Sequence, residues 1–327
     1  MMNEYDNCKL CPRRCGIDRR KKAGYCGMTD RMMIARADLH FWEEPCISGK
    51  SGSGAVFFMG CPMHCAFCQN YNIANAKTDI TSDGITVDRL AEIFFELKEK
   101  GANNINLVTA DHFVPTVALA IEKAKTKGIN IPFVYNTSSY INVETLKMLD
   151  GLIDVYLPDF KYMDSNLSYD LSKCRDYSKV ALEAIEEMYR QVKKPRFYLK
   201  GDFLKTYDAD WYNDMECEDE ILIKSGVIVR HLILPGHEND SKAIIKTLLD
   251  KFGENIYLSV MNQYTPVMEE SMAKKIGHEE FLNKLDDEIY NNILDYAIDC
   301  GIENGFFQDG ATMEESFIPE FNEKGIS

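Results

Sequence analysis

A strand followed by a helix recurs six times between residues 55 and 300, and this alternation constrains the fold most. The predicted strands cover 55–59, 104–110, 131–137, 152–160, 226–236 and 255–263. The predicted helices cover 86–101, 116–127, 142–151, 178–192, 241–253 and 279–300. Such alternation predicts an α/β fold, a parallel sheet with helical crossovers. The pattern leaves open whether the sheet curls into an open barrel or lies flat and doubly wound. In either case the functional site is expected beyond the carboxyl ends of the strands.

A short loop with three cysteines, GCPMHCAFCQN at 60–70, follows the first predicted strand. Its spacing is Cys-x3-Cys-x2-Cys, formed by Cys61, Cys65 and Cys68. Thiolates favour zinc or iron–sulfur centres. Structural zinc requires a fourth ligand, whereas a [4Fe–4S] cube held by three thiolates keeps one iron open. The loop therefore predicts a metal centre, with the iron–sulfur cube favoured over zinc.

The cysteine spacing, with aromatic Phe67 just before the last cysteine, resembles the radical S-adenosylmethionine (SAM) superfamily. The segments VYLPDFKY, VRHLILPGH and MNQYTPV also resemble the group related to pyruvate formate-lyase activating enzyme. The resemblance implies a partial (β/α)6 barrel with a [4Fe–4S] cluster on Cys61, Cys65 and Cys68. It also implies that SAM binds the open iron and is split by one electron into methionine and a 5′-deoxyadenosyl radical, which abstracts hydrogen from a substrate. A flavodoxin or ferredoxin would supply the electron.

The resemblance leaves the substrate open. One hypothesis is an activating enzyme whose substrate is a glycine in a partner glycyl radical enzyme. A second keeps the radical chemistry but assigns a peptide or small metabolite as substrate. A third, from another class, is a non-catalytic iron–sulfur or zinc protein. No catalytic side chain can be named from the sequence.

Polar residues at the predicted strand ends are candidates for binding SAM or substrate, together with Phe67. The superfamily often carries Gly-Gly-Glu-Pro after its second strand, whereas this chain has VTADHFVP, so Asp111 is the candidate substitute. The remaining candidates are Asn136, Ser138, Asp159, Lys161 and His231, with Arg230 beside the last. Each has a structural alternative: Asn136 and Ser138 as helix caps, Asp159 and Lys161 as a simple ion pair, and His231 as a structural histidine.

A second set of cysteines precedes the barrel, within NCKLCPRRCGIDRRKKAGYCG. Cys8, Cys11, Cys15 and Cys26 form Cys-x2-Cys-x3-Cys-x10-Cys, and four thiolates on so short a loop predict a second metal, zinc or an iron–sulfur cluster. Cys46 is an alternative ligand. The basic residues between these cysteines, Arg13 to Lys22, are expected to form a solvated loop.

Charge and hydropathy exclude other classes of function. With 37 basic and 52 acidic residues the net charge is −15, so a broad nucleic-acid interface is not expected. No apolar run reaches the roughly 18–20 residues that span a bilayer, and the first residues lack signal-peptide features, so a cytoplasmic protein without membrane contact is expected. The predicted division is a cysteine-rich metal-binding segment at 1–50, the barrel at 51–310, and a tail at 311–327 that docks on the barrel.

Overall fold

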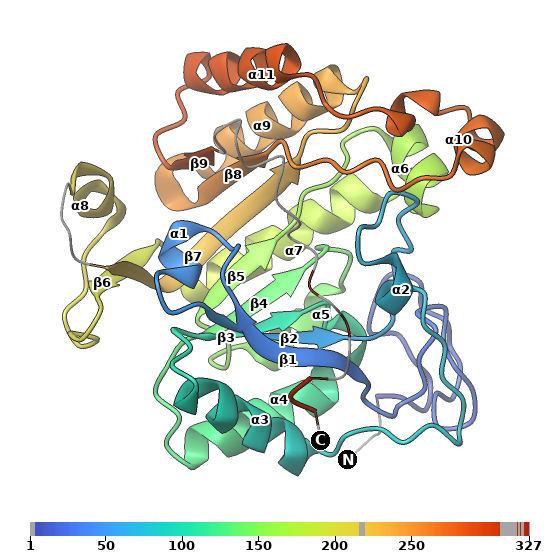
Figure 1. Cartoon of the computed structure of the whole chain (residues 1–327), viewed down its shortest axis with the longest axis vertical. Coiled ribbons are helices and arrows are strands. Elements are labelled where there is room, and N and C mark those ends of the chain that lie inside the picture. The colour runs from blue at the N-terminus through green and yellow to red at the C-terminus, as the bar shows by residue number, and fades with distance from the viewer. Residues whose placement is uncertain (1–3, 216–219, 308–318, 320, 322–323, 327) are drawn as a thin grey trace.

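The computed structural model describes residues 4–215, 220–307, 319, 321 and 324–326. One sheet forms the centre of the molecule, in the order β1-β2-β3-β4-β5-β7-β8-β9, with β6 beside β7 (Figure 1). The strands are β1 Ile34–His40, β2 Ser53–Phe58, β3 Ile105–Val108, β4 Phe133–Thr137, β5 Val155–Pro158, β6 Arg196–Leu199, β7 Ile221–Leu232, β8 Tyr257–Met261 and β9 Gly305–Phe307.

The helices connect these strands and follow the predicted order. The α-helices are α1 Pro45–Ser48, α2 Tyr71–Ala74, α3 Val87–Glu99, α4 Val114–Thr126, α5 Val143–Leu146, α6 Ser165–Ser172, α7 Tyr177–Val192, α8 Ala209–Asp214, α9 Glu238–Phe252, α10 Glu270–Ile276 and α11 Asp287–Asp299. The 3-10 helices are η1 Asp111–Phe113, η2 Lys147–Leu149, η3 Gly253–Asn255 and η4 Glu279–Leu282. No helix in the described part of the chain is long and apolar enough to cross a membrane.

The strand order distinguishes the two architectures that the sequence left open. From β2 to β9, β6 aside, every neighbouring pair is parallel and the spatial order follows the chain order. Because parallel crossovers are right-handed, an order that never reverses places the connecting helices on one side of the sheet. A doubly wound sheet needs a reversal. The chain is therefore an open α/β barrel, and the predicted partial (β/α)6 barrel with a cysteine-rich extension is confirmed.

Helix α3 shows how the local sequence produces these units. The Thr86 side chain accepts a hydrogen bond from the amide of Arg89, which caps the first turn as predicted. Its apolar stripe, Leu90, Ile93, Phe94 and Leu97, is buried between helix and sheet. Beyond the helix, Gly101 has a φ of +94°, the left-handed conformation that suits a glycine after a helix.

Several element boundaries differ from the prediction. The helix expected over 279–300 begins only at Asp287, because η4 precedes it and the Asp286 side chain caps α11. Asn142 precedes α5, but its side chain donates to the carbonyl of Lys9 instead of capping the helix. Strands β1, β6 and β9 were not predicted; β9 adds a seventh parallel strand, and β1 and β6 pair antiparallel with β2 and β7.

The inner face of the barrel is closed at one end by α1. Cys46 and Ile47 of α1 pack against Val134, Leu157 and Ile228, which point inward from three strands. Cys46 is therefore part of the barrel core and does not lie with the cysteines before residue 27, which corrects its proposed role as an alternative ligand. Strand β1 and helix α1 fall within residues 1–50, which were predicted as a cysteine-rich metal-binding segment. In the structure both contact the barrel: β1 pairs with β2 along its length, and α1 forms the barrel floor.

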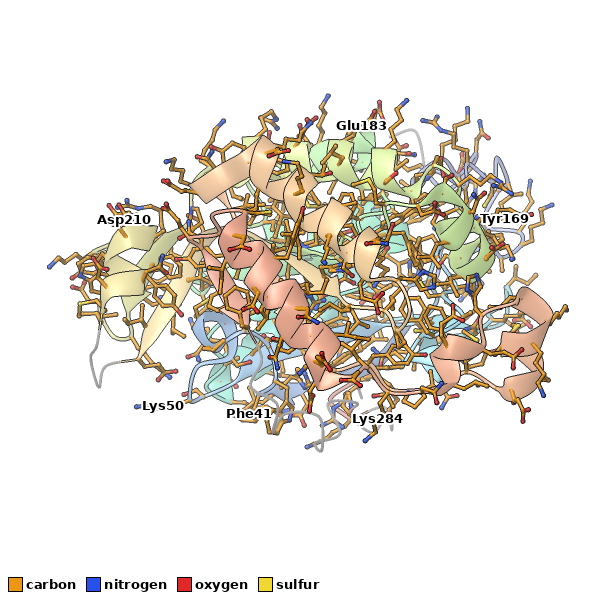
Figure 2. All side chains as sticks on the ribbon, turned by 90° about the horizontal axis from the view of Figure 1, so that it is seen from above. Phe41, Lys50, Tyr169, Glu183, Asp210 and Lys284 are labelled. Atoms are coloured by element: carbon orange, nitrogen blue, oxygen red, sulfur yellow. The ribbon has the colours of Figure 1, made fainter. Side chains whose placement is uncertain are left out.

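Parts of the C-terminal tail that the structure describes contact β1 and β2. The amide of Ala37 donates to the carbonyl of Lys324, the Lys324 ammonium pairs with Asp38, and the ring of Phe321 packs edge-on against Phe57. Residues 311–318 of the predicted tail lie outside the described residues. Charged side chains such as Lys50, Glu183, Asp210 and Lys284 extend from the periphery of the molecule (Figure 2).

Candidate functional site

The three-cysteine loop leaves β2 through Gly60, which has a φ of +82°. A Cβ atom at this position would lie 2.6 Å from the carbonyl oxygen of Cys26 and 2.4 Å from Cγ of Met28, so only glycine fits. The carbonyl of Cys26 also accepts a hydrogen bond from the amide of Cys61 (3.2 Å). His64 turns away from the cysteines, with its ring nitrogens hydrogen-bonded to Asn75 and to the carbonyl of Tyr25. The loop therefore presents its thiols without a nearby histidine ligand.

A cavity of about 250 Å³, partly open to solvent, lies beside this loop at the carboxyl ends of the strands. This is close to the lower end of the roughly 300–1,000 Å³ of ordinary small-molecule pockets. Eight predicted site residues line it: Cys61, Cys65, Phe67, Cys68, Asn136, Ser138, Asp159 and Lys161. The structure thus brings together the thiols and the polar residues that follow β4 and β5.

Asp111 and His231 are not among the cavity-lining residues. The Asp111 carboxylate accepts hydrogen bonds from Tyr135 (2.9 Å) and Thr137 (2.6 Å), and Tyr135 belongs to the core between sheet and helices. The His231 ring bonds the carbonyl of Phe160 and the hydroxyl of Ser241 in α9. His231 alternates with Arg230 along β7, so its side chain is on the opposite face of the strand, toward α9. Asp111 belongs to η1 and lies behind Thr137, which lines the cavity.

Burial shifts the pKa values of both residues. It raises the pKa of Asp111 to about 6, against the lowering effect of the Thr137 and Tyr135 hydrogen bonds. It lowers the pKa of His231 to about 4, so the ring is neutral at physiological pH. Both directions are those expected when a charged form loses its hydration.

An ion network spans the inside of the barrel below the cysteine loop. Arg230 donates to Asp159 (Nε to Oδ1, 3.0 Å), to Glu43 (Nη1 to Oε2, 3.1 Å) and to Asn136 (Nη2 to Oδ1, 2.6 Å). Lys161 donates to the other carboxylate oxygen of Asp159 (2.7 Å). Burial alone would raise the pKa of Asp159, but Lys161 and Arg230 together hold it below its ordinary value. The site therefore holds two cations and an ionised carboxylate together, with each side chain between 15 and 22% exposed.

Glu43 was missed by the sequence analysis. It lies between β1 and α1, where the chain crosses the interior of the barrel, and not at a strand end. Its second oxygen accepts from Asn106 (2.8 Å). Burial raises the pKa of Glu43, although the charge of Arg230 opposes this. The only feature of the sequence at this point is the pair of acidic residues before Pro45 in WEEPC. That pair does not indicate that Glu43 reaches the interior of the barrel.

Two polar atoms in the cavity wall indicate that a ligand fits there. Ser138 Oγ and Gln263 Oε1 are buried and have no hydrogen-bond partner within the described residues. Buried polar groups are nearly always hydrogen-bonded, so such atoms beside a cavity suit a polar ligand. Three convergent thiols and these unpartnered acceptors and donors fit an iron–sulfur cluster with a bound amino acid derivative.

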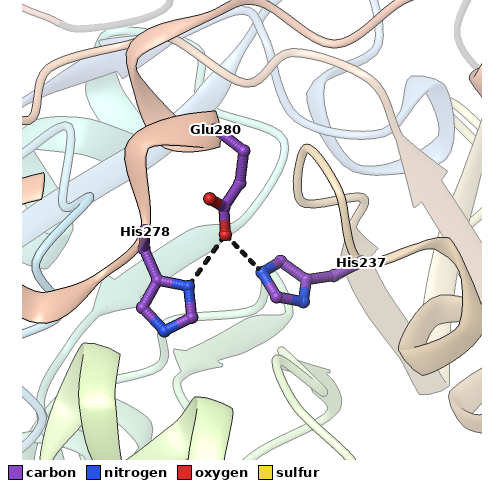
Figure 3. A group of neighbouring side chains, drawn as sticks. All are labelled: His237, His278 and Glu280. Atoms are coloured by element: carbon purple, nitrogen blue, oxygen red, sulfur yellow. Dashed lines mark hydrogen bonds and ion pairs between the residues drawn. The ribbon is translucent and has the colours of Figure 1, made fainter.

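Phe67 connects the cysteine loop to the C-terminal part of the chain. Its ring stacks on Phe281 of η4, with centroids 6.0 Å apart and planes 17° apart, and meets Tyr162 edge-on. Phe281 is in turn packed by the rings of His237 and His278. Both histidines hydrogen-bond the same oxygen of Glu280, at 3.0 and 2.8 Å (Figure 3). This group fixes η4 against the loop between Cys65 and Cys68.

The cysteine-rich leader, residues 4–33, packs against the three-cysteine loop. Cys8, Cys11 and Cys26 are buried and Cys15 is half-buried. Its basic residues are not all solvated, which corrects the sequence prediction for two of them. Arg19 is fully buried, and Arg13 donates to the carbonyls of Pro62, Ser172 and Lys173. These two arginines join the leader to the barrel.

The comparisons with known proteins agree with this geometry. Residues 55–199 match the family model described as the radical SAM superfamily. The chain is 27% identical over 268 residues to the uncharacterized protein MJ0674 of Methanocaldococcus jannaschii, covering 81% of this chain and 68% of that protein. Residues 55–199, which include the three-cysteine loop, therefore match a radical SAM domain.

Two solved structures show a partial likeness to this chain. Streptococcus suis SuiB bound to S-adenosylmethionine matches with a TM-score of 0.47 and 14% identity, over 77% of this chain and 48% of SuiB. A domain of pyruvate-formate lyase-activating enzyme from Bacteroides vulgatus matches with a TM-score of 0.37 and 11% identity, over 60% of this chain and 91% of the domain. The chain thus spans about half the length of SuiB. The family implies a [4Fe–4S] cluster and SAM as cofactors.

Proposed function

We propose that the protein is an enzyme that reductively cleaves SAM and uses the resulting radical to abstract hydrogen from a substrate. The observation that carries this proposal is the position of Cys61, Cys65 and Cys68 at the wall of a cavity that is also lined by unpartnered polar atoms. When bound there, the cluster and SAM would supply a 5′-deoxyadenosyl radical. The chain's own residues hold these groups and keep water from the radical.

The three thiols would hold the cluster and leave one iron for SAM. Ser138 and Gln263 are placed to hydrogen-bond the polar part of SAM, because both line the cavity and lack partners. Lys161 and Arg230 present positive charge beside the cavity, which favours a carboxylate. Asp159 keeps both cations in place through its two oxygens. Binding and orientation are the roles assigned to these residues, and none is assigned proton transfer.

For the substrate we favour a protein or peptide segment, as in the activation of a glycyl radical enzyme. The cavity opens to solvent on one side, which would let an extended chain enter beside SAM. The segments VYLPDFKY, VRHLILPGH and MNQYTPV resemble the activating-enzyme group. A small metabolite is the second candidate, supported by the buried cations that would bind an anionic group.

The deciding experiment is anaerobic reconstitution with iron and sulfide, reduction, and measurement of 5′-deoxyadenosine after SAM is added. Wild type is expected to form it, and Cys61→Ala, Cys65→Ala and Cys68→Ala variants are expected to lose it. Absence of product from a protein that carries its cluster would contradict the proposal. Deuterium transfer into 5′-deoxyadenosine from a labelled glycyl radical enzyme, compared with labelled small molecules, would then separate the two substrate classes.

A further inference from the structure

We propose that Cys8, Cys11, Cys15 and Cys26 hold a second [4Fe–4S] cluster, which receives one electron from a carrier protein and passes it to the cluster on the three-cysteine loop. This inference rests on the proposed function only for the destination of the electron. The identity of the metal is argued from the leader itself.

The leader encloses its thiols with its own backbone. The amide of Cys8 donates to the carbonyl of Ile17, and the amide of Gly16 donates to the carbonyl of Cys8, both at 2.9 Å. The amide of Tyr25 donates to the sulfur of Cys15 (3.4 Å), a contact that stabilises a thiolate. A Cβ atom on Gly24 would lie 3.5 Å from the sulfur of Cys26 and 3.9 Å from that of Cys15. Two of the sulfurs therefore flank one glycine, whose small size leaves them room.

The fully buried guanidinium of Arg19 indicates a negative group among these thiols. It donates to the carbonyls of Met28 (3.1 Å), Thr29 (2.6 Å) and His112 (2.5 Å), and its Nη1 lies 4.0 Å from the sulfur of Cys8. No carboxylate in the described part of the chain pairs with it. A buried charge without a counter-ion is strongly unfavourable. Four thiolates around a metal centre would leave a net negative charge, and that charge would compensate Arg19.

The spacing of the sulfurs favours a cube over a single zinc ion. Tetrahedral zinc with Zn–S bonds near 2.3 Å holds its sulfurs about 3.8 Å apart. Among the described residues, no three cysteine sulfurs lie within 4.8 Å of one another. This holds equally for Cys61, Cys65 and Cys68, for which the family implies a [4Fe–4S] cluster. A cube bonded to one thiolate at each corner requires such wider spacing.

The two cysteine sets are joined by a direct backbone hydrogen bond. The carbonyl of Cys26 accepts from the amide of Cys61 (3.2 Å), and Arg13 donates to the carbonyl of Pro62 (2.9 Å). Cys26 of the leader and Cys61 of the three-cysteine loop are therefore joined directly through their backbones. An electron can cross this short hydrogen-bonded path without an intervening carrier.

The outer surface of the leader suits an acidic electron carrier. Lys9, Arg14 and Lys22 are exposed, and no ion pair is recorded for them with any described residue. A basic surface is unusual on a chain with a net charge of −15 and attracts an acidic partner. A reduced carrier of the flavodoxin or ferredoxin class would give one electron to the leader cluster and become oxidised. The leader cluster would then pass that electron to the SAM-ligating cluster, which becomes reduced.

The test uses full-length protein with Cys61, Cys65 and Cys68 all changed to Ala, reconstituted with iron, sulfide and zinc together. We expect about four irons per chain and the electron paramagnetic resonance signal of a reduced [4Fe–4S] cluster. Additional Cys8→Ala and Cys11→Ala changes should abolish this iron. About one zinc and no iron in the folded protein would overturn the proposal, whatever the result for SAM cleavage.

A second measurement uses wild type and one single variant, and so does not depend on the folding of the multiple variants. Wild type should bind about eight irons, and Cys300→Ala, which removes a thiol outside both sets, should bind the same number. About four irons in wild type would contradict a second cluster. In the reduced wild type, the paramagnetic signals should show coupling between two nearby spins. A spectrum equal to the sum of two isolated clusters would overturn the electron relay.

Discussion

The guanidinium of Arg230, in the middle of the barrel, is bonded to Asp159 at a distance of 3.0 Å between Nε and Oδ1. Asp159 is at the same time the partner of Lys161. One carboxylate therefore bridges two half-buried cations from different segments of the chain, and Glu43 is a second partner of Arg230. The electrostatic arrangement of the cavity depends on it.

Asp159→Asn should lower the free energy of unfolding by about 3–5 kcal/mol, because Lys161 and Arg230 would lose a buried counter-charge. Denaturant unfolding monitored by circular dichroism measures this. Asp210→Asn, at an exposed position, should change the value by less than about 0.5 kcal/mol. Equal effects of the two substitutions would show that the network contributes little to stability.

Gly60→Ala should prevent the three-cysteine loop from adopting its conformation, because the new Cβ would overlap the carbonyl of Cys26. Gly128→Ala is the matched control: Gly128 has a similar φ of +90° but nothing within 4 Å of its Cβ position. Both variants should lose about 1 kcal/mol through backbone strain. Only Gly60→Ala should also lose iron on reconstitution, as measured by iron content.

Ser138→Ala should weaken SAM binding by roughly 2- to 10-fold, the value of one hydrogen bond. The stability of the SAM-free protein should stay the same or rise, since the hydroxyl is buried without a partner. Isothermal titration of reconstituted protein gives the affinity, with exposed Ser271→Ala as the control. An unchanged affinity would remove Ser138 from the SAM site.

Asp111→Asn should leave SAM affinity unchanged, because Asp111 lies behind Thr137 and does not line the cavity. The folded protein raises the pKa of this carboxyl from 3.8 to about 6, so the folded state binds its proton more tightly than the unfolded state. Wild type should therefore lose up to roughly 3 kcal/mol relative to the variant as pH rises from 4 to 6. Unfolding curves at several pH values test this. A fall in SAM affinity would contradict the placement.

His231→Gln should make the protein less sensitive to acid. Burial lowers the pKa of His231 from 6.5 to about 4, so below pH 6.5 the unfolded state takes up the proton more readily. The contribution of neutral His231 to the free energy of unfolding is fully present above pH 6.5 and is lost as pH falls toward 4. At pH 5 about 2 kcal/mol of this contribution should have been lost. The free energies of unfolding of wild type and variant, compared at pH 7 and at pH 5, measure this effect. His112 is also buried, but it is present in both proteins, so its titration does not change the difference between them.

The sequence predicted the barrel units and much of the cavity wall, since parallel strands bring their carboxyl ends to one edge. It could not assign the face of each strand-end residue, because a shift of one residue moves a side chain to the opposite face. Arg230 and His231 illustrate this: the first points to Asp159 and the second to Ser241 of α9. Glu43 was unpredictable because it reaches the site from the segment between β1 and α1, and no periodic pattern locates such a crossing.

That crossing has a consequence for how the chain can be divided. A fragment starting at residue 51 would lack Glu43, the floor formed by α1, and the edge strand that covers β2. The barrel would then lack a complete interior, so residues 34–48 belong structurally to the barrel and not to the leader. A fragment meant to fold as the barrel has to begin before residue 34.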